Sequence, residues 1–272
     1  MALIVIKVGG EVASGPELDP LCLDVKVLVD RGDDILIVHG GGPQATELSQ
    51  RLGIEVKQVG GRRITDLETL NVMKMTLAGR INVDLCAALC RHGLRPVGLH
   101  GASSLVIEAR RRPPRVVSGG GPDPIDFGFV GDVTGFNLGL IELLWSADNV
   151  PVLACLGADA EGNVYNINAD IVANQLAATT NADHLFLVTS VPGVLKDLKD
   201  TNSRIPRLTA EEARLAISEG TIAGGMIPKV EEALKVLDGG VGAIHILGKL
   251  SPGDLVRAVD DPGSVGTSLI AD

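Results

Sequence analysis

The sequence predicts an α/β protein in which helices pack on a mainly parallel sheet. Short runs of consecutive aliphatic residues, such as Leu3–Ile6 and Ile35–Val38, show no polar alternation, which is typical of strands buried on both faces. Segments with helical spacing of apolar residues separate these runs. Hydrophobic residues make up 45% of the chain but aromatic residues only 2%, so we expect an aliphatic core between helices and sheet.

Length and charge limit the classes of function. A chain of 272 residues can bury a large core, either as one domain or as two lobes. Its net charge of −10 argues against general binding to nucleic acids or membranes, but small anions can still bind where cations gather. No apolar run reaches the length of a membrane span, and the chain starts directly with strand-like residues. We therefore expect a cytoplasmic protein.

The expected elements alternate in an α/β rhythm around a more irregular stretch at residues 95–133. In chain order they are strand 3–8, helix 17–30, strand 35–38, helix 43–52, extended segment 56–64, helix 66–92, helix 137–147, strand 150–155, helix 168–181, strand 184–189, helices 209–218 and 226–238, strand 242–247, helix 251–259 and strand 265–270. Thr209 with Glu212, and Ser251 before Pro252, are typical helix starts.

The segment Ile35–Pro43 is the one around which the other elements are expected to be organised. A buried strand runs directly into Gly40–Gly42, and Pro43 suits the first position of the following helix. Glycines let backbone N–H groups approach a ligand oxygen, and a helix N-terminus adds partial positive charge. A tight turn that needs positive φ is the alternative. Three consecutive glycines exceed what such a turn requires, so an anion site is favoured.

Helix 66–92 and the stretch that follows it leave two interpretations open. Thr65 and Glu68 suit a capping box, and the apolar stripe of the helix is either core or a self-association face. The arginine run 110–115 is most simply an exposed strand edge or hairpin tip, and residues 118–126 a Gly/Pro-rich loop. The stripe consists of Leu67, Leu70, Met73, Leu77, Ile81, Leu85 and Leu89.

Two lysines stand where a positive charge is unfavourable unless an anion binds nearby. Lys7 interrupts an apolar strand just before Gly9 and Gly10, at the sheet edge where open α/β sheets bind ligands. Lys229 lies at a helix start, where the helix dipole disfavours a cation. The alternatives are a Lys7 side chain that extends to solvent and an ordinary surface position for Lys229.

Further polar groups stand next to helix starts and turns. Asp170 follows the cap residue Asn168, a position that favours a carboxylate and could also hold ammonium groups in place. Arg63 can grip a carboxylate with two parallel hydrogen bonds, although Arg62 and Arg63 could equally be solvated. The turn at 189–195 can line a nucleotide pocket or be only a turn. Packed thiols, with no metal site, are expected of Cys22, Cys86, Cys90 and Cys155.

Seven short segments, in order along essentially the whole chain, resemble the amino acid kinase family. The resemblance implies an open three-layer α/β/α sandwich, with an N-terminal lobe (1–160) for amino-acid binding and dimerisation and a C-terminal lobe (161–272) for ATP. It also implies phosphorylation of the γ-carboxylate of N-acetyl-L-glutamate in arginine biosynthesis. The segments are Ile6–Gly10, Val38–Pro43, Gly61–Thr65, Gly128–Gly131, Asn166–Asp170, Thr189–Val194 and Gly225–Lys229.

The resemblance further implies roles for individual residues. Lys7 and Lys229 would stabilise the transferring phosphoryl group, and Asp170 would orient both lysines. Gly41 and Gly42 would lie against the acceptor, and Arg63 and Asn166 would hold its α-carboxylate. The ATP, with Mg²⁺ held mainly by its phosphates, would rest on Thr189, Ser190, Val191, Pro192, Gly193, Val194, Leu195, Thr221, Ile222 and Ala223.

The chain departs from the family pattern at three places. Ser190 stands where Asp is usual, Gly60 where Asn is common, and Ala102–Ser104 where an acidic residue is frequent. Helix 66–92 resembles the family's dimer-forming helix, which favours a homodimer and the self-association interpretation of the stripe. Arginine-inhibited members resemble one another in an extra helix before the first strand, which begins here by Leu3. We therefore expect a dimer that arginine does not inhibit.

Other activities fit the same residues. A glutamate-type carboxylate, with a pKa of about 4.3, is already ionised at neutral pH and needs no general base. A kinase for another acidic substrate, such as carrier-linked aminoadipate, and a non-catalytic sensor with the same fold are alternatives. A Rossmann dehydrogenase fits Gly40–Ala45 formally, but its fingerprint wants an acidic residue about 20 residues on, and Val56–Ile64 contains none.

Overall fold

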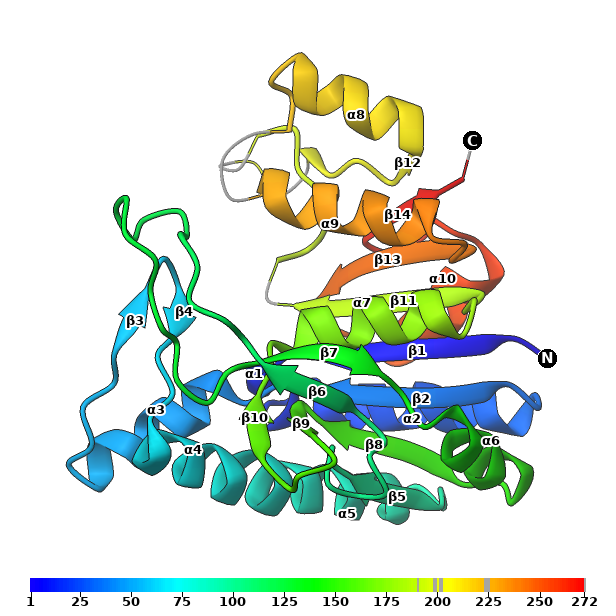
Figure 1. Ribbon diagram of the computed structural model, residues 1–272. Coiled ribbons are helices and arrows are strands. Elements are labelled where there is room, and N and C mark those ends of the chain that lie inside the picture. Colours follow the sequence, from blue (N-terminus) through cyan, green and yellow to red (C-terminus); the bar gives the residue numbers. More distant parts are fainter. Residues whose placement is uncertain (190, 198–199, 201–202, 223–225, 272) are drawn as a thin grey trace.

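A computed structural model describes residues 1–189, 191–197, 200, 203–222 and 226–271, without the side chains of Pro228 and Lys229 (Figure 1). The expected α/β/α sandwich is confirmed. Its central sheet has eight strands in the order β12-β14-β13-β11-β1-β2-β8-β5, and all neighbours are parallel except β13 and β14. The strands are β1 (Leu3–Val8), β2 (Asp34–His39), β5 (Pro96–Leu99), β8 (Val150–Ala154), β11 (His184–Thr189), β12 (Arg207–Thr209), β13 (Ala243–Gly248) and β14 (Thr267–Ile270).

Helices cover both faces of this sheet, as its uninterrupted aliphatic strands require. One layer contains α2 (Leu18–Asp30), which packs against both α5 (Asn82–Arg91) and α10 (Asp254–Asp260). The other contains α7 (Ala169–Thr179), packed against β1 and against α9 (Met226–Asp238). Four more helices lie along the outside: α6 (Leu138–Ser146) beside β8, α8 (Ala210–Ser218) beside α9, and α3 (Gly42–Arg51) beside α4 (Leu67–Met73).

Smaller elements gather near one end of the parallel strands. A second sheet, in the order β10-β9-β6-β7, is built from β6 (Glu108–Arg111), β7 (Gly131–Gly135), β9 (Leu156–Ala158) and β10 (Val164–Asn166). A two-stranded hairpin, β3 (Gln58–Val59) and β4 (Arg62–Arg63), occupies the segment that was expected to be simply extended. The short helix α1 (Gly10–Ala13), which the sequence did not predict, follows β1 directly.

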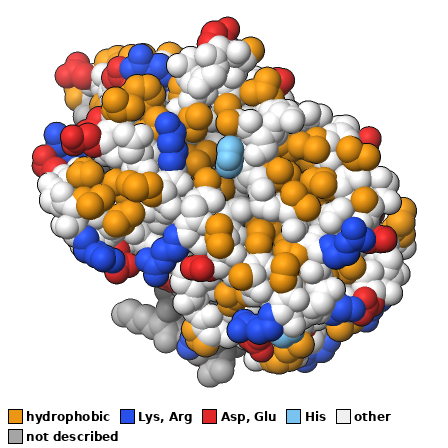
Figure 2. All heavy atoms as spheres, turned by 90° about the horizontal axis from the view of Figure 1, so that it is seen from below, with side chains coloured by type: hydrophobic (Ala, Val, Ile, Leu, Met, Phe, Trp, Pro, Cys, Tyr) orange, Lys and Arg blue, Asp and Glu red, His pale blue; other side chains and the backbone are white. Residues whose placement is uncertain are grey.

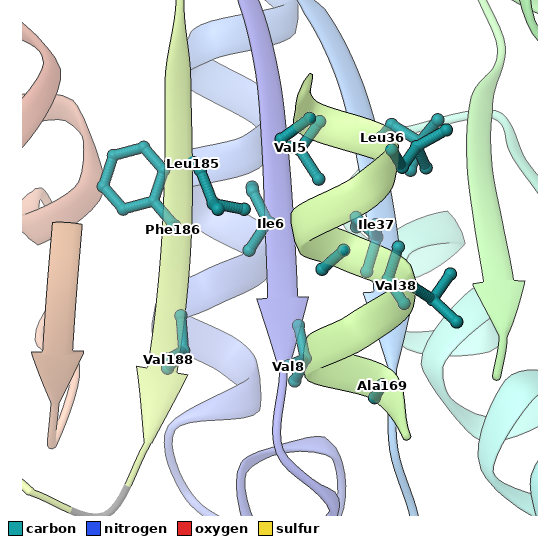
Figure 3. Close-up of a cluster of buried hydrophobic side chains, with 14 of the residues drawn as sticks. Val5, Ile6, Val8, Leu36, Ile37, Val38, Ala169, Leu185, Phe186 and Val188 are labelled. Atoms are coloured by element: carbon teal, nitrogen blue, oxygen red, sulfur yellow. The ribbon is translucent and has the colours of Figure 1, made fainter. Parts of the chain in front are cut away.

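The core between α7 and the sheet is aliphatic, as the composition indicated. Figure 3 shows α7 crossing β1 and β2, with Ala169 at the helix start beside the end of β1 at Val8. Val5, Ile6, Leu36 and Ile37 of these strands are fully buried, and their side chains alternate between the two faces of the sheet. This packing fixes the start of α7 at the carboxyl ends of the central strands, where open α/β sheets bind ligands.

Two predicted helix starts are corrected by the structure. Asp66, not Thr65, caps α4: its carboxylate accepts a hydrogen bond from Thr69 N over 2.8 Å, while Thr65 is fully buried outside the helix. The helix expected from residue 251 begins at Asp254, because the Asp254 carboxylate accepts a bond from Ser251 N in the preceding turn. The capping box of Thr209 and Glu212 and the cap at Asn168 are confirmed.

The long helix predicted at 66–92 is present but contains a π-helical segment, η1 (Lys74–Ile81), between α4 and α5. The apolar stripe is mostly core rather than a self-association face: of its seven residues only Leu67 is exposed. Exposed apolar side chains on the same helix are instead Met75 and Val83, at 52% and 60%. The interface interpretation of the stripe was therefore wrong, because this face of the helix packs in the protein's own core.

The described part of the chain contains no helix that is long and apolar enough to cross a membrane.

The expectation of packed thiols holds for Cys22 and Cys155, which are buried, but is wrong for Cys90, which is exposed, while Cys86 is half-buried.

Candidate active site

A cavity of about 450 Å³ opens where β1, β2 and β10 end and α3 and α7 begin. Six of the residues proposed from the sequence line it: Lys7, Gly41, Gly42, Arg63, Asn166 and Asp170. They come from positions far apart in the chain. The parallel order of the sheet brings them together, since the carboxyl ends of neighbouring strands meet at one edge.

The turn Gly40–Gly42 forms one wall of the cavity, and close approach rather than positive φ explains its composition. None of the three residues has a φ in the left-handed region, and Gly41, at φ 170°, is extended. The simple-turn alternative, which assumed a need for positive φ, is therefore wrong in its premise. A Cβ on Gly41 would lie 2.3 Å from Ile81 Cδ1 and 2.5 Å from Leu77 Cδ2, whereas one on Gly42 would meet nothing within 4 Å. The absence of a side chain at Gly41 therefore lets the long helix pack closely against the turn. At Gly42 it leaves the backbone accessible from the cavity.

Lys7 and Asp170 form an ion pair across the floor of the cavity, with Nζ 2.8 Å from Oδ1. The Lys7 side chain is 15% exposed, so its ammonium group is largely removed from water but not isolated. Asp170 lies in the first turn of α7, where its backbone N–H donates to the Asn168 side chain over 2.8 Å. The helix N-terminus favours the carboxylate, and the carboxylate holds the ammonium at the cavity.

Arg63 and Asn166 lie on either side of the buried residue Thr65. Arg63 Nη2 donates to Gly42 O over 3.2 Å and to Thr46 Oγ1 over 2.7 Å, whereas its buried Nη1 has no partner among the described residues. Burial lowers the pKa of Arg63 below its ordinary value. Asn166 Nδ2 donates to Thr65 Oγ1 over 3.1 Å. A buried guanidinium nitrogen of this kind can donate a hydrogen bond to an anion.

Three arginines that line the cavity were not proposed as site residues from the sequence. Arg112 is 6% exposed and paired with Asp132, its Nη2 lying 2.7 Å from Oδ1, so the arginine run is not simply an exposed tip. Arg115 and Arg62 are exposed at the cavity. Partial removal of its guanidinium from water by burial lowers the pKa of Arg115, although the residue as a whole is exposed, and the positive charge of Arg112 adds to this effect. The dense arginine run at 110–115 was the sequence signal for this cluster, although we expected it to form an exposed strand edge or hairpin tip.

Gly60 shows why a glycine replaces the family's usual residue at the tip of the β3–β4 hairpin. Its φ is +54°, and a Cβ there would lie only 2.1 Å from Ser118 O. The tip is thus pressed against the loop that contains Ser118. A small apolar cluster, in which Val59 and Ile64 pack against Val117 and Phe127, holds the two segments together. The hairpin is therefore anchored rather than loosened by this departure.

Those residues proposed for the nucleotide that the structure describes do not line this cavity. Thr189, Val191, Pro192 and Thr221 are half-buried, and Gly193 packs against Thr267. The side chains of Val194, Leu195 and Ile222 are buried, so these three can offer a ligand only their backbone. Ser190 and Ala223 lie outside the described residues, as does the side chain of Lys229, whose backbone stands in the first turn of α9.

Metal binding and thiol chemistry find little support in the described residues. They contain no group of three or more His, Cys, Asp or Glu that could hold a metal ion. Cys155 lines the cavity, but burial raises the pKa of its thiol to about 12, so it stays protonated at neutral pH. The acidic side chains at the cavity are Asp170 and Glu232, against the cations of Lys7 and four arginines. The cavity as described is suited to anions.

A model of the amino acid kinase family matches residues 2–248. The chain belongs to the amino acid kinase family. Within this family it is similar to the acetylglutamate kinase of Anaeromyxobacter dehalogenans (strain 2CP-1), at 57% identity over 272 residues and the full length of both chains.

Solved structures show the same amino acid kinase fold. The protein smu.665 of Streptococcus mutans UA159 has a TM-score of 0.77 and 29% identity, covering 99% of both chains. The N-acetylglutamate synthase of Neisseria gonorrhoeae, solved with coenzyme A and L-arginine, has a TM-score of 0.82 at 22% identity, over all of this chain and 62% of that one. The latter likeness concerns the fold alone.

Proposed function

We propose that this protein transfers the γ-phosphoryl group of ATP to the γ-carboxylate of N-acetyl-L-glutamate, forming N-acetyl-L-glutamyl 5-phosphate in arginine biosynthesis. Full-length identity of 57% to a protein named acetylglutamate kinase supports this reaction. The observation that carries it in the structure is the cavity itself, where the Lys7–Asp170 pair faces a glycine turn and a guanidinium with a free nitrogen.

The acceptor is bound, in this proposal, through its α-carboxylate at Arg63 and Asn166. Arg63 Nη1, which has no partner in the part of the chain that the structure describes, supplies a charge-assisted hydrogen bond to this carboxylate. Gly41 and Gly42 place backbone N–H groups at the start of α3, where intrahelical acceptors are lacking. These groups and the helix dipole stabilise the oxygens of the transferring phosphoryl group.

Lys7 and Lys229 neutralise the charge that moves with the phosphoryl group, and Asp170 orients them. The ion pair of Lys7 with Asp170 supports the first half of this assignment. The acceptor carboxylate is already an anion at neutral pH, so the protein has no proton to remove. Catalysis then consists of bringing two anions together and stabilising the charge between them, which positioned cations and N–H groups achieve.

The nucleotide rests on the backbone of the turn at 189–195 and of residues 221–223, on the C-terminal half of the sheet. Mg²⁺ is bound mainly by the phosphates of ATP, as expected for an ion that keeps few protein ligands. This assignment divides the molecule into an acceptor lobe (1–160) and a nucleotide lobe (161–272). The sheet order supports it, because β5, β8, β2 and β1 form one half and β11, β13, β14 and β12 the other.

We further propose a cytoplasmic homodimer formed through the outer face of the α4–η1–α5 helix. Leu67, Met75 and Val83 recur at intervals of eight residues and are all more than half exposed. Figure 2 views the molecule from the side on which this helix lies in Figure 1 and shows exposed hydrophobic side chains on that face. Burying such residues against a second copy removes apolar area from water.

Acceptor competition tests the reaction. Purified protein is incubated with Mg-ATP and N-acetyl-L-glutamate, L-glutamate or L-aspartate, and ADP release is followed together with hydroxylamine trapping of the acyl phosphate. Turnover and hydroxamate formation with N-acetyl-L-glutamate alone support the proposal. Absence of turnover with every acceptor would instead support a non-catalytic sensor.

One observation favours a second acceptor class. Among the described residues, Arg62 and Arg115 have no ion pair, and both lie at the cavity, where a larger acidic acceptor such as carrier-linked aminoadipate would pass. A parallel assay with aminoadipate attached through its amino group to an acidic peptide separates the two. A higher kcat/KM for the peptide-linked acceptor would favour this alternative.

A further inference from the structure

A buried pair of polar side chains, His39 and Asn82, lies directly beneath the glycine turn and has no part in the mechanism above. His39 is the last residue of β2 and is fully buried, and Asn82 begins α5 with 6% exposure. Asn82 Nδ2 lies 3.0 Å from His39 Nε2 and 3.0 Å from Val152 O. His39 Nδ1 lies 3.0 Å from Gly40 O.

These contacts specify the protonation of the imidazole. Val152 O can only accept, so the Asn82 atom that faces it is the NH₂ group, and His39 Nε2 must accept from the same group. Gly40 O also can only accept, so Nδ1 must donate. Burial lowers the pKa of His39 to about 4, so the ring is neutral at pH 7 and carries its single proton on Nδ1.

The bond from His39 completes a pattern in which every carbonyl of the glycine turn is engaged. Gly40 O accepts from His39 Nδ1, Gly41 O from Ala45 N over 3.0 Å, and Gly42 O from Arg63 Nη2 over 3.2 Å. A carbonyl oxygen that faced the cavity would repel an incoming phosphate. The three donors hold all of these oxygens on protein groups.

The orientation of the Gly40 carbonyl also determines that of the next N–H. In a trans peptide the C=O and N–H bonds point in opposite directions, and no cis peptide occurs in the described residues. With Gly40 O held against the His39 ring, the N–H of Gly41 faces the other way. Glycines on both sides of this peptide permit rotation at little steric cost, so the backbone alone does not prevent a flip.

We propose that His39 and Asn82 are positioning residues that lock the Gly40–Gly41 peptide with its N–H directed at the transferring phosphoryl group. This inference rests on the proposed kinase function and adds residues to it. Asn82 fixes the tautomer of His39, and His39 fixes the peptide. A glycine in β5 provides the space for the Asn82 side chain. A Cβ on Gly98 would lie 2.0 Å from Asn82 Oδ1, so a larger residue there would displace this side chain.

Two matched replacements of His39 separate the lock from general packing. The amide nitrogen of His39→Asn is as many bonds from Cα as Nδ1 and can still donate to Gly40 O. The amide of His39→Gln corresponds to Nε2 and keeps the contact with Asn82 only. We expect His39→Gln to lower kcat about 10²-fold, as for loss of one oxyanion donor, with little change in either KM. His39→Asn should remain within about tenfold of the wild type.

Equal loss of kcat in the two variants, or a loss that appears in KM or follows the melting temperature, would overturn the proposal. Binding of Mg-ADP with fluoroaluminate and N-acetyl-L-glutamate gives a second readout, because this complex imitates the phosphoryl group in flight. Its affinity should fall in His39→Gln by the same factor as kcat, while Mg-ADP affinity alone is unchanged.

The wild-type protein provides a test that no folding defect can obscure. Long-range ¹⁵N–¹H spectra of protein labelled at histidine distinguish a protonated ring nitrogen from one with a lone pair. The proposal requires a single set of ring resonances for His39, with the proton on Nδ1. This set is assigned to His39 because it is lost in His39→Asn. A proton on Nε2 would refute the role proposed for His39 even if the protein phosphorylates N-acetyl-L-glutamate. Because the spectra do not depend on turnover, a negative kinase assay would not alter the position of the proton.

Discussion

Lys7 Nζ lies 2.8 Å from Asp170 Oδ1, which joins the end of the first strand to the start of the helix that crosses it. Because α7 packs on β1, with Ala169 at the helix start beside the end of the strand, this pair is held by the core rather than by flexible side chains alone. The relation places a cation at the glycine turn with its charge only partly neutralised.

Replacing Asp170 by Asn removes the charge that orients Lys7 but keeps the size of the side chain. We expect kcat to fall about 10²-fold with smaller changes in KM, because positioned charge acts mainly on the transition state. A coupled assay for ADP measures this. Asp126→Asn is the matched control, since Asp126 pairs with Arg111 outside the cavity. Equal activity of Asp170→Asn and the control would contradict the assigned role.

Replacing Arg63 by Lys tests the α-carboxylate site. Lysine retains the charge but loses the fork of parallel N–H donors, so we expect KM for N-acetyl-L-glutamate to rise about 10- to 100-fold while KM for Mg-ATP is unchanged. Arg111→Lys serves as the control, because Arg111 is exposed and pairs with Asp126 outside the cavity. A rise in KM for ATP instead of the acceptor would place the nucleotide at Arg63.

The two inner glycines of the turn should respond differently to alanine. Gly41→Ala forces the buried side chains of Ile81 and Leu77 to move, which should cost about 1–3 kcal/mol in the free energy of unfolding. Gly42→Ala meets open space and should preserve stability while it obstructs the cavity and lowers kcat/KM. Urea unfolding and steady-state kinetics on both variants check this, and the reverse order would show that the turn faces the other way.

Stability should decrease as the solution is acidified below neutral pH, through buried histidines. Burial lowers the pKa of His245 to about 3 and that of His39 to about 4. In the unfolded chain both titrate near pH 6.5. Between about pH 6.5 and pH 4 the unfolded state therefore binds more protons, and the free energy of unfolding falls by up to about 1.4 kcal/mol per pH unit for each ring.

Urea unfolding at several values between about pH 5 and pH 7 measures this slope. His245→Gln removes one of the titrating rings and should make the slope shallower, although it also removes contacts with His184 and Ser268. The comparison therefore concerns the dependence on pH and not the stability at any one pH. An unchanged slope would mean that His245 is already charged in the folded protein.

The proposed dimer can be tested by placing a charge on the outer face of the long helix. Met75→Glu and Val83→Glu should shift sedimentation from dimer to monomer, because burying a carboxylate without a partner is unfavourable. Leu143→Glu is the control: Leu143 is 64% exposed, but on α6. Dissociation by Leu143→Glu and not by the other two would move the interface to α6.

Much of the architecture could be predicted because it depends on short-range patterns. Uninterrupted aliphatic runs specified β1, β2, β8, β11 and β13 of the central sheet, whereas β5 and β12 were not among the expected strands. Asn168, Thr209 and Glu212 specified helix starts through bonds within one turn. The apolar stripe of the long helix was recognised, but its partner was not. Periodicity shows which face of a helix is buried and is silent on whether the same chain or a second copy covers it.

The same limit separates the site residues that were proposed from those that were missed. Lys7, Arg63, Asn166 and Asp170 stood out because each lies beside a turn or helix start, and the family pattern joined them. Arg112 stood in a dense arginine run, but nothing in that run distinguished it from its neighbours, since its burial depends on Asp132 in β7. Nor did the capping pattern show that Thr65 would be fully buried and bonded to Asn166.

By itself the sequence determined the elements, the aliphatic core and the family, because hydrogen-bonding and hydrophobic periods operate over neighbouring residues. The tertiary structure alone decided which charges meet, which carbonyls of the glycine turn are engaged, and which arginines enter the cavity. Those facts depend on distances between atoms far apart in the chain, and such distances exist only once the sheet order and the packing of helices on it are established.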